Sequence, residues 1–285
     1  MKKQKILLAA TAGLLFLLAG CGQKLDTSKT TYQQDGMVAV IKGSASGHKT
    51  VSYQADTTSG TAKINSGSYV ISIPTSTKAQ QVKLTAGDTT KTVTVKAAKS
   101  LGTYSKVAAT FNQAIIATAL PKSVQAQLKS AATAKQPTKA ELAAMTEAQR
   151  AALVKTQTEL KAAMDKATAA TKDQQLPTSV DGLKQVLKTT GGTVRVNVQD
   201  GQLMSAVDIV PIKALKDKKL QEAFGVQFGV LANAVGADAT KVGKKFQDAT
   251  KNANSSSTTI DTIVSNGVKF DVGYSTTELY IYLTK

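Results

Sequence analysis

The sequence predicts a multidomain protein with an all-β sandwich near the N-terminus, an α-helical middle segment and an α+β C-terminal domain containing an antiparallel sheet. Short β-type runs recur at intervals of roughly 8 to 12 residues between Met37 and Ala97. Ala, Lys, Gln and Thr then dominate residues 106–176, where glycine almost disappears. Hairpin signals return in the last third of the chain. The expected segments are 1–20 (leader), 21–36 (tether), 37–105 (sandwich), 106–176 (helical segment) and 177–285 (α+β domain).

The first residues have the pattern of an export signal. Met1-Lys-Lys-Gln-Lys5 carries three lysines, and the apolar run ILLAATAGLLFLL follows it. A basic start, a short apolar stretch and small residues before a cut are typical of a signal peptide. A membrane-spanning helix needs about 20 apolar residues, and Thr11 and Gly13 interrupt this shorter run. A simple transmembrane anchor is therefore the weaker interpretation.

The run ends in Leu18-Ala19-Gly20-Cys21, which resembles the lipobox of bacterial lipoproteins. The resemblance implies that the Cys21 thiol is alkylated with diacylglycerol and that the signal is cut just before it. It places the protein on the extracellular face of the cell membrane. Two acyl chains anchor a protein stably, whereas one is marginal. Cys21 is then a lipid attachment point and neither a catalytic thiol nor half of a disulfide.

Cys21 is the only cysteine of the chain, so the remaining domains must fold without disulfides. This usage fits surface proteins of Gram-positive bacteria. Residues 22–36, GQKLDTSKTTYQQDG, are polar and show little apolar periodicity. They predict a flexible tether between the lipid and the first domain.

The chain is strongly basic. It has 36 Lys and Arg against 19 Asp and Glu, a net charge of +17, and the three leader lysines leave +14 for the remainder. Arg150 and Arg195 are the only arginines, and tryptophan is absent. Nucleic-acid recognition favours arginine forks and stacking aromatics, so no nucleic-acid partner is expected. Scattered lysines suit anionic wall polymers or lipid headgroups, or they only keep the protein soluble.

The predicted strands of the N-terminal domain are MVAVIK, KTVSYQA, GTAKI, SYVISIP, QQVKLT and TKTVTVKA, with turn residues between them. Alternation is clear where Ile71 and Ile73 oppose Val70 and Ser72. Over residues 37–97 this pattern resembles the small immunoglobulin-like modules of bacterial surface proteins. The resemblance implies a β-sandwich, without the cysteine pair or core tryptophan of antibody domains.

Two capping boxes mark helix starts in the middle segment, at Thr138–Glu141 and Thr146–Gln149. The second box predicts a long helix to about Ala170. Its apolar stripe is thin, so the segment is either a packed hairpin or a spacer. Residues 108–120, AATFNQAIIATAL, are apolar enough to favour the packed hairpin.

The C-terminal domain is expected to begin with a short helix, VDGLKQVLK, followed by strands on both sides of Asp200-Gly201. A central buried helix is predicted from the spacing of Leu220, Phe224, Phe228, Leu231 and Val235, widened by Ala223, Val226, Val230 and Ala234. A second helix over about 239–251 and strands around Asn266-Gly267 complete the α+β domain. Gly225 and Gly229 indicate close packing of the central helix on the sheet.

Catalytic groups are hard to find, and no enzymatic activity, cofactor or metal is expected. His48 is the only histidine, so it lacks the partners of a metal site. Ser46-Gly-His-Lys49 matches the S-x-x-K pattern of penicillin-recognising enzymes, but it falls between predicted strands and no S-D-N or K-T-G follows. Asp200 and Asp238 are explained by a turn and a helix cap. The carboxylates left for an acid–base pair are on or beside strands, where charges usually face water: Asp208, Asp261, Asp271 and Glu278.

Tyr280 and Tyr282 project from the last strand opposite its apolar face, and Lys285 follows them. These three residues are the candidate ligand contacts, because tyrosine rings beside a lysine suit a sugar or a peptide. The alternative is that both tyrosines cover the sheet or pack on a neighbouring domain.

The sequence therefore favours a membrane-anchored, extracellular lipoprotein that serves as a non-enzymatic binding or structural module at the cell envelope. Its partners are the membrane, through Cys21, and an unknown protein or peptide ligand. Alternatives are the substrate-binding lipoprotein of a transporter, an immunity or exclusion lipoprotein, and a wall-active hydrolase. A ligand-sized cleft between lobes would favour the transporter, and two carboxylates facing each other in a groove would favour the hydrolase.

Overall fold

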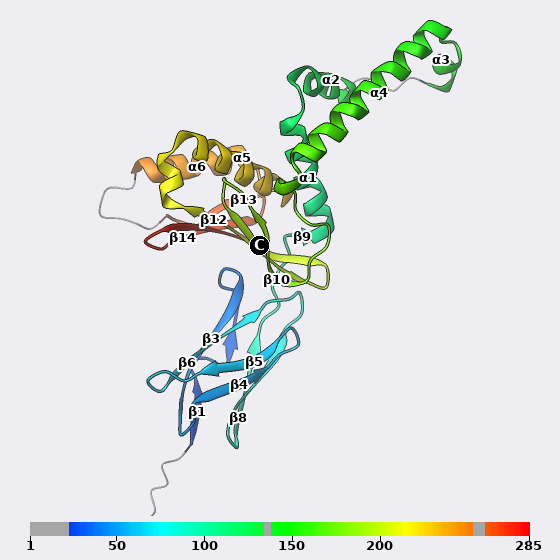
Figure 1. Ribbon diagram of the computed structural model, residues 1–285. Coiled ribbons are helices and arrows are strands. Elements are labelled where there is room, and N and C mark those ends of the chain that lie inside the picture. The colour runs from blue at the N-terminus through cyan, green and yellow to red at the C-terminus, as the bar shows by residue number, and fades with distance from the viewer. Residues whose placement is uncertain (1–22, 134–137, 253–259) are drawn as a thin grey trace, which may run out of the picture.

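The structure, a computed structural model, describes residues 23–133, 138–252 and 260–285. The lipobox residues Leu18, Ala19, Gly20 and Cys21 lie outside the described residues. A β-sandwich, a sheet covered by helices and a projecting helical arm follow one another in space (Figure 1).

The β-sandwich consists of two sheets that share one core. One sheet has the strand order β1-β3-β6 and the other the order β2-β8-β7-β4-β5. The bounds are β1 Lys24–Thr27, β2 Thr31–Tyr32, β3 Val38–Ser46, β4 Thr50–Gln54, β5 Ser59–Lys63, β6 Ser68–Pro74, β7 Gln80–Ala86 and β8 Thr89–Val95. In β6 the side chains of Tyr69, Ile71 and Ile73 enter the core, whereas Val70 is exposed. All six strands predicted between Met37 and Ala97 are confirmed, because alternation with one buried face specifies a strand directly.

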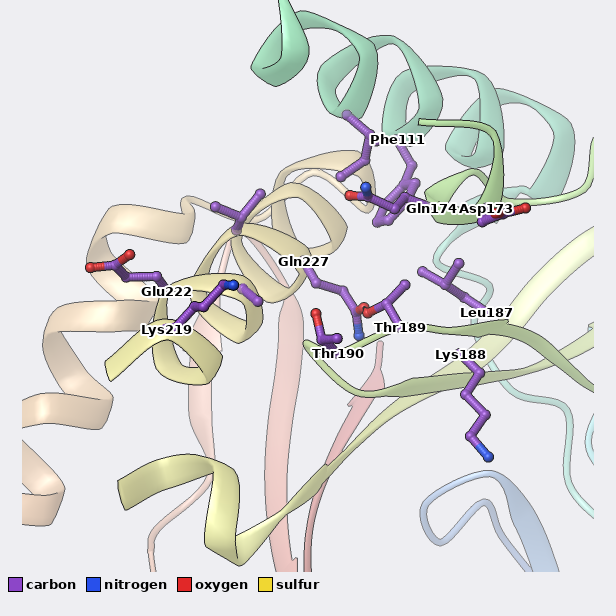
Figure 2. A pocket seen from close by; sticks show the side chains of 13 residues that line it. Phe111, Asp173, Gln174, Leu187, Lys188, Thr189, Thr190, Lys219, Glu222 and Gln227 are labelled. Atoms are coloured by element: carbon purple, nitrogen blue, oxygen red, sulfur yellow. The ribbon is translucent and has the colours of Figure 1, made fainter. Parts of the chain in front are cut away.

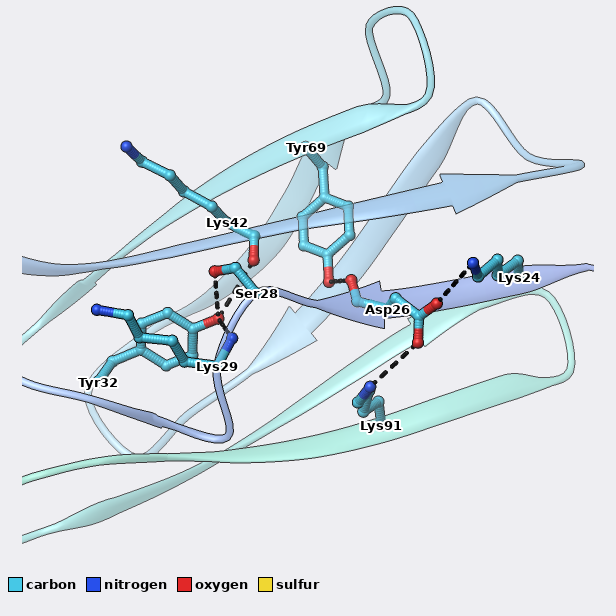
Figure 3. Close-up of polar contacts among 8 residues, drawn as sticks. All are labelled: Lys24, Asp26, Ser28, Lys29, Tyr32, Lys42, Tyr69 and Lys91. Carbon is cyan, nitrogen blue, oxygen red and sulfur yellow. Dashed lines mark hydrogen bonds and ion pairs between the residues drawn. The ribbon is translucent and has the colours of Figure 1, made fainter.

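The expected flexible tether over residues 22–36 is wrong for the residues that form β1 and β2. β1 pairs with β3 and β2 pairs with β8, and Leu25 and Tyr32 are buried in the sandwich core. Polar contacts reinforce this start (Figure 3): Asp26 lies 3.1 Å from the Nζ of Lys24 and 3.3 Å from that of Lys91. The hydroxyl of Tyr69 donates to the Asp26 carbonyl at 2.9 Å. Strands with only one inward apolar side chain are too short to show periodicity in the sequence.

The C-terminal domain is built on an antiparallel sheet with the strand order β10-β11-β12-β15-β14-β13, and β9 pairs with β12. The bounds are β9 Gly102–Thr103, β10 Gly182–Lys188, β11 Thr193–Gln199, β12 Gln202–Pro211, β13 Ile263–Ser265, β14 Val268–Tyr274 and β15 Glu278–Thr284. The hairpin at Asp200-Gly201 is confirmed, with φ of 52° and 70°, and Asn266-Gly267 has φ of 51° and 78°. Positive φ at both central residues is the geometry of the tight turn that suits strand twist.

Residues 182–188 form strand β10, so the expected helix VDGLKQVLK is wrong. The register between β10 and β11 shifts between Gln185 and Leu187, which makes Val186 the extra residue of a bulge. A bulge breaks the period of two, and Leu183, Val186 and Leu187 then have the spacing of a helix. The hydrogen bonds to β11 decide the outcome.

Helices cover one face of this sheet. They are α1 Tyr104–Ala119, α5 Lys218–Ala234 and α6 Ala239–Asn252. Phe228 of α5 lies at the centre of an aromatic cluster, 5.6 Å from Phe224, 5.6 Å from Phe246 and 5.8 Å from Phe270 between ring centroids. The predicted central buried helix is thus confirmed, but Val226, which was expected on its buried face, is 45 % exposed. Close packing at Gly225 and Gly229 is wrong, because a Cβ added at either would meet nothing within 4 Å.

The middle segment divides into two parts. Val107, Ala108, Phe111 and Ile115 of α1 belong to the same core as the C-terminal sheet. Beyond α1, the helices α2 Lys122–Thr133, α3 Lys139–Ala143 and α4 Glu147–Ala170 form the helical arm, which projects away from the sheet (Figure 1). Both predicted capping boxes are present. Of the described arm side chains only Ala167 is buried, so the packed-hairpin interpretation holds for α1 and not for the arm.

Buried and partly buried hydrogen bonds join the sandwich to the face of the C-terminal sheet that the helices leave open. Asn197 Nδ2 donates to the carbonyls of Met37 at 3.2 Å and Thr75 at 3.1 Å. Ser205 Oγ donates to the Met37 carbonyl at 3.3 Å. Asn197 and Ser205 are both fully buried. The two domains therefore meet at a fixed interface and not through a free linker.

Candidate functional site

The structure places Tyr280 and Tyr282 on the open face of the sheet, opposite the buried Leu279, Ile281 and Leu283 of the same strand. Their rings stack with centroids 6.3 Å apart and planes 12° apart. The Tyr280 hydroxyl donates to Glu278 Oε2 at 2.6 Å. The expected alternation of β15 is confirmed.

Both tyrosines line a cleft of about 520 Å³ between this open face and residues 35–38 of the sandwich. Tyr282 reaches the sandwich, since a Cβ added at Gly36 would lie 3.2 Å from its ring. The pKa of Tyr282 is raised, mainly by burial and to a smaller extent by the negative charge of nearby Asp35. Arg195 also lines the cleft, whereas Lys285 does not. Tyr282 therefore packs on the neighbouring domain, and Tyr280 is the ring with freer access.

A second cavity, of about 510 Å³, lies where α1, α5 and the β10–β11 connection meet (Figure 2). We call it the helix-side pocket. Its apolar lining is formed by Phe111, Ile115, Leu187, Ala223 and Val226, and its polar lining by Asp173, Gln174, Lys188, Thr189, Thr190, Lys219, Glu222 and Gln227. Glu222 and Asp173 lie at opposite ends of it in Figure 2, so they do not face each other across a groove. An apolar pocket with a few converging polar groups is the usual form of a ligand site.

A chain of hydrogen bonds, buried at its Asp208 end and partly buried elsewhere, supports the wall of the helix-side pocket. Gln227 Nε2 donates to Asp208 Oδ1 at 2.8 Å, and Thr189 Oγ1 donates to Gln227 Oε1 at 2.6 Å. The Gly191 amide donates to Thr189 Oγ1 at 2.9 Å. These bonds occupy both ends of the Gln227 amide and fix its orientation. The wall that a ligand would meet is therefore rigid.

Asp208 is the buried end of this chain. Its side chain is 0 % exposed, and Oδ2 has no hydrogen-bond partner among the described residues. Burial raises the pKa of Asp208 to about 7, although the hydrogen bonds from Gln227 and the Ile209 backbone act in the opposite direction. The expectation that this carboxylate faces water is wrong. β12 lies between β11 and β15, and nearly all of its residues are buried, so neither face of this strand is exposed to solvent.

The other carboxylates are separated from Asp208. Asp271 lines the cleft on the open face, whereas Asp208 bonds to α5 on the helix-covered face. Asp200 lies in a tight turn, and Asp238 Oδ1 accepts from the Lys241 amide at 3.0 Å as an N-terminal cap. No acid–base pair forms between Asp208 and Asp271, because the sheet separates them.

The remaining motif residues lie in the sandwich. Ser46 ends β3 and Lys49 precedes β4, so the S-x-x-K pattern spans a strand connection, where no helix start positions the serine. His48 is half-buried, with no described hydrogen-bond partner for Nε2. In the described ranges, no group of three His, Cys, Asp or Glu side chains is arranged to hold a metal ion.

Asp208, Gln227 and Thr189 come from β12, α5 and the β10–β11 connection, so no local motif unites them. The available signal in the sequence for a buried carboxyl was Asp208, the single charged residue within the mostly apolar run Met204–Val210.

No family model matches the chain, and no curated protein matches it. Within residues 23–133, 138–252 and 260–285, no helix is long and apolar enough to cross a membrane.

Proposed function

We propose that the protein is a lipid-anchored binding module of the cell envelope without enzymatic activity. The Cys21 thiol carries a diacylglyceryl group and holds the chain on the extracellular face of the membrane. The β-sandwich, in the manner of immunoglobulin-like modules, acts as a rigid spacer. The C-terminal domain presents the ligand site.

The observation that carries this proposal is the helix-side pocket with its fixed amide. Its lining combines apolar side chains from α1, β10 and α5 with Thr189 and Gln227, whose polar atoms are already held by Asp208 and Gly191. A wall held in place by its own hydrogen bonds loses little freedom when it binds. Such a pocket suits an apolar side chain presented by a peptide or protein partner.

Binding of short fluorescent peptides, identical except for one central residue, tests the ligand class. Peptides with central Leu or Phe should bind the full chain more tightly than those with Ala or Asp. Val226, which lines the pocket and is 45 % exposed, gives the blocking variant Val226→Lys. We expect it to weaken binding at least about tenfold, since a long charged side chain replaces one of the apolar residues that line the pocket.

Val264→Lys is the matched control, because Val264 is 49 % exposed on β13 and does not line the pocket. Unchanged binding in Val264→Lys with a loss in Val226→Lys supports the pocket. An equal effect of both variants, or no preference for Leu or Phe, would refute it.

Anchoring has a separate test. In cells given a labelled fatty acid, the chain should become labelled, and Cys21→Ala should abolish both the label and membrane retention.

Binding to purified walls with and without anionic polymers, across a salt series, tests the function of the lysines. Polymer-dependent binding that falls steeply with salt would make the positive charge functional.

The cleft beside Tyr280 is the one observation that favours the alternative of a transporter's substrate-binding lipoprotein. Its walls are a β-sandwich and an antiparallel sheet, and not two α/β lobes. A solute that binds there should be lost in Tyr280→Ala and retained in Val226→Lys. That pattern would favour the transporter's substrate-binding lipoprotein over the peptide-binding module. The immunity alternative would require a toxin or phage component that the protein intercepts.

A further inference from the structure

One end of the β-sandwich gathers the start of β1 with several strand connections. Lys24 pairs with Ser46 at the end of β3, and Thr50 at the start of β4 pairs with Lys63 at the end of β5. We call this the basal end and define it by Gln23–Lys24, Ser46–Lys49, Lys63–Gly67 and Gly87–Asp88. Backbone bonds connect these turns: Ile64 N donates to the Lys49 carbonyl and Ala45 N to the Gly67 carbonyl, both at 2.9 Å.

The basal end faces away from the rest of the molecule. The opposite end of the sandwich contains Met37 and Thr75, whose carbonyls bond to Asn197 of the C-terminal sheet. In Figure 1 the C-terminal domain and the helical arm lie beyond that opposite end. A body anchored near Lys24 thus has its ligand pocket and its arm on the far side.

Very little chain separates Cys21 from the basal end. β1 begins at Lys24, three residues after Cys21. Three Cα–Cα steps of 3.8 Å span at most about 11 Å. This reach is close to the Debye length of roughly 8 Å at physiological salt. Salt would therefore only partly screen the attraction between charges at the basal end and an anionic membrane surface.

The exposed charges of the basal end are mostly positive. Lys49 and Lys63 are exposed and are in no ion pair with a described residue, whereas Lys24 is shared with Asp26. Asp88 is the acidic residue of this end. Each lysine held near an anionic leaflet strengthens binding by up to about fivefold.

We propose that the basal end of the sandwich docks on anionic phospholipid headgroups and holds the molecule upright on the membrane. This inference rests on the proposed lipid attachment at Cys21. It deepens that proposal by replacing a freely tethered protein with an oriented one.

Site-specific fluorophores on the full-length protein test the orientation. Lipidation consumes Cys21, so an introduced cysteine is the only free thiol. Ser66→Cys labels the basal end, and Thr77→Cys, also exposed, labels the end near the C-terminal domain. The acylated protein is reconstituted in vesicles containing phosphatidylglycerol and a headgroup quencher. We expect several-fold stronger quenching at position 66 than at position 77.

Charge variants test the role of the lysines. Lys49→Glu combined with Lys63→Glu should reduce quenching at position 66 to the level at position 77. Lys129→Glu combined with Lys184→Glu makes the same change in charge on exposed residues of α2 and β10, and should leave the quenching unchanged. Phosphatidylcholine vesicles and high salt should likewise reduce the quenching at position 66 to the level at position 77.

The outcomes separate the two proposals. Equal quenching at positions 66 and 77 in a protein shown by mass to be acylated would overturn docking and leave the anchor intact. Absence of the acyl group would overturn both. Quenching at position 66 that survives Lys49→Glu with Lys63→Glu would refute the electrostatic docking.

Discussion

Gln227 ties helix α5 to the middle of the sheet, because its Nε2 donates a 2.8 Å hydrogen bond to Oδ1 of Asp208. Oδ2 of the same carboxyl is buried and has no described partner. An ionised carboxylate in such surroundings loses its hydration and regains only part of it through hydrogen bonds. The centre of the domain therefore favours a protonated Asp208, and its stability depends on pH.

The first prediction concerns that dependence. Burial raises the pKa of Asp208 from 3.8 to about 7, so between these values the folded chain binds more protons than the unfolded chain. The contribution of Asp208 to the stability of the C-terminal domain should be fully present below about pH 4 and should be lost as the pH rises to about 7, a fall of roughly 4 kcal/mol from this group. Urea unfolding across this range measures the fall.

Asp208→Asn should remove most of that decline and stabilise the domain at pH 8. The amide oxygen can still accept from Gln227, and no charge is buried. The exposed Asp88→Asn is the control for lost charge and should keep the decline. A pH profile unchanged by Asp208→Asn would contradict the assignment.

The second prediction concerns the contact between Gly36 and Tyr282. Gly36 has φ of 60° and Gly67 has φ of 78°, so alanine at either position incurs about 1 kcal/mol of backbone strain. Only at Gly36 would the new Cβ meet a neighbour, Tyr282, at 3.2 Å. Gly36→Ala should therefore reduce the free energy of unfolding more than Gly67→Ala. Equal losses of unfolding free energy in the two variants would show that the Tyr282 ring moves aside at no energetic cost.

The third prediction concerns the joint between the domains. Asn197→Ala leaves the Thr75 carbonyl without its amide donor and should cost about 1 to 3 kcal/mol. Because this bond crosses the interface, we expect one unfolding transition to separate into two. The exposed Gln81→Ala loses only a side-chain bond to Thr94 within the sandwich and should change the stability little. A single, equally sharp transition in Asn197→Ala would contradict this role.

The fourth prediction concerns the helical arm. Thr146 Oγ1 accepts from the Gln149 amide, and Thr146→Ala should destabilise the first turn of α4 by about 1 kcal/mol. Hydrogen exchange should accelerate at this turn, while the melting temperature of the C-terminal core stays constant, because the arm is outside that core. Thr156→Ala, in the exposed middle of α4, should not accelerate exchange. A lower core melting temperature in Thr146→Ala would show that the arm is coupled to the core.

Much of the fold is readable in the sequence where a pattern is local. The alternation around Ile71 and Ile73, the turn at Asp200-Gly201 and the boxes at Thr138 and Thr146 each specify their structure through neighbours only a few residues away. The expected apolar and polar faces of β15 are also confirmed, although the packing of Tyr282 on Gly36 was only one of two alternatives.

The tertiary structure decided what depends on distant partners. β10 is a strand because β11 offers it hydrogen bonds, and the bulge at Val186 hides that strand in the sequence. β1 and β2 join the sandwich because its core accepts Leu25 and Tyr32. Asp208 is buried because strands flank β12 on both sides and α5 covers it. The sequence by itself determined the local elements and the leader pattern, whereas burial and the two cavities follow from long-range packing, which no short window of residues encodes.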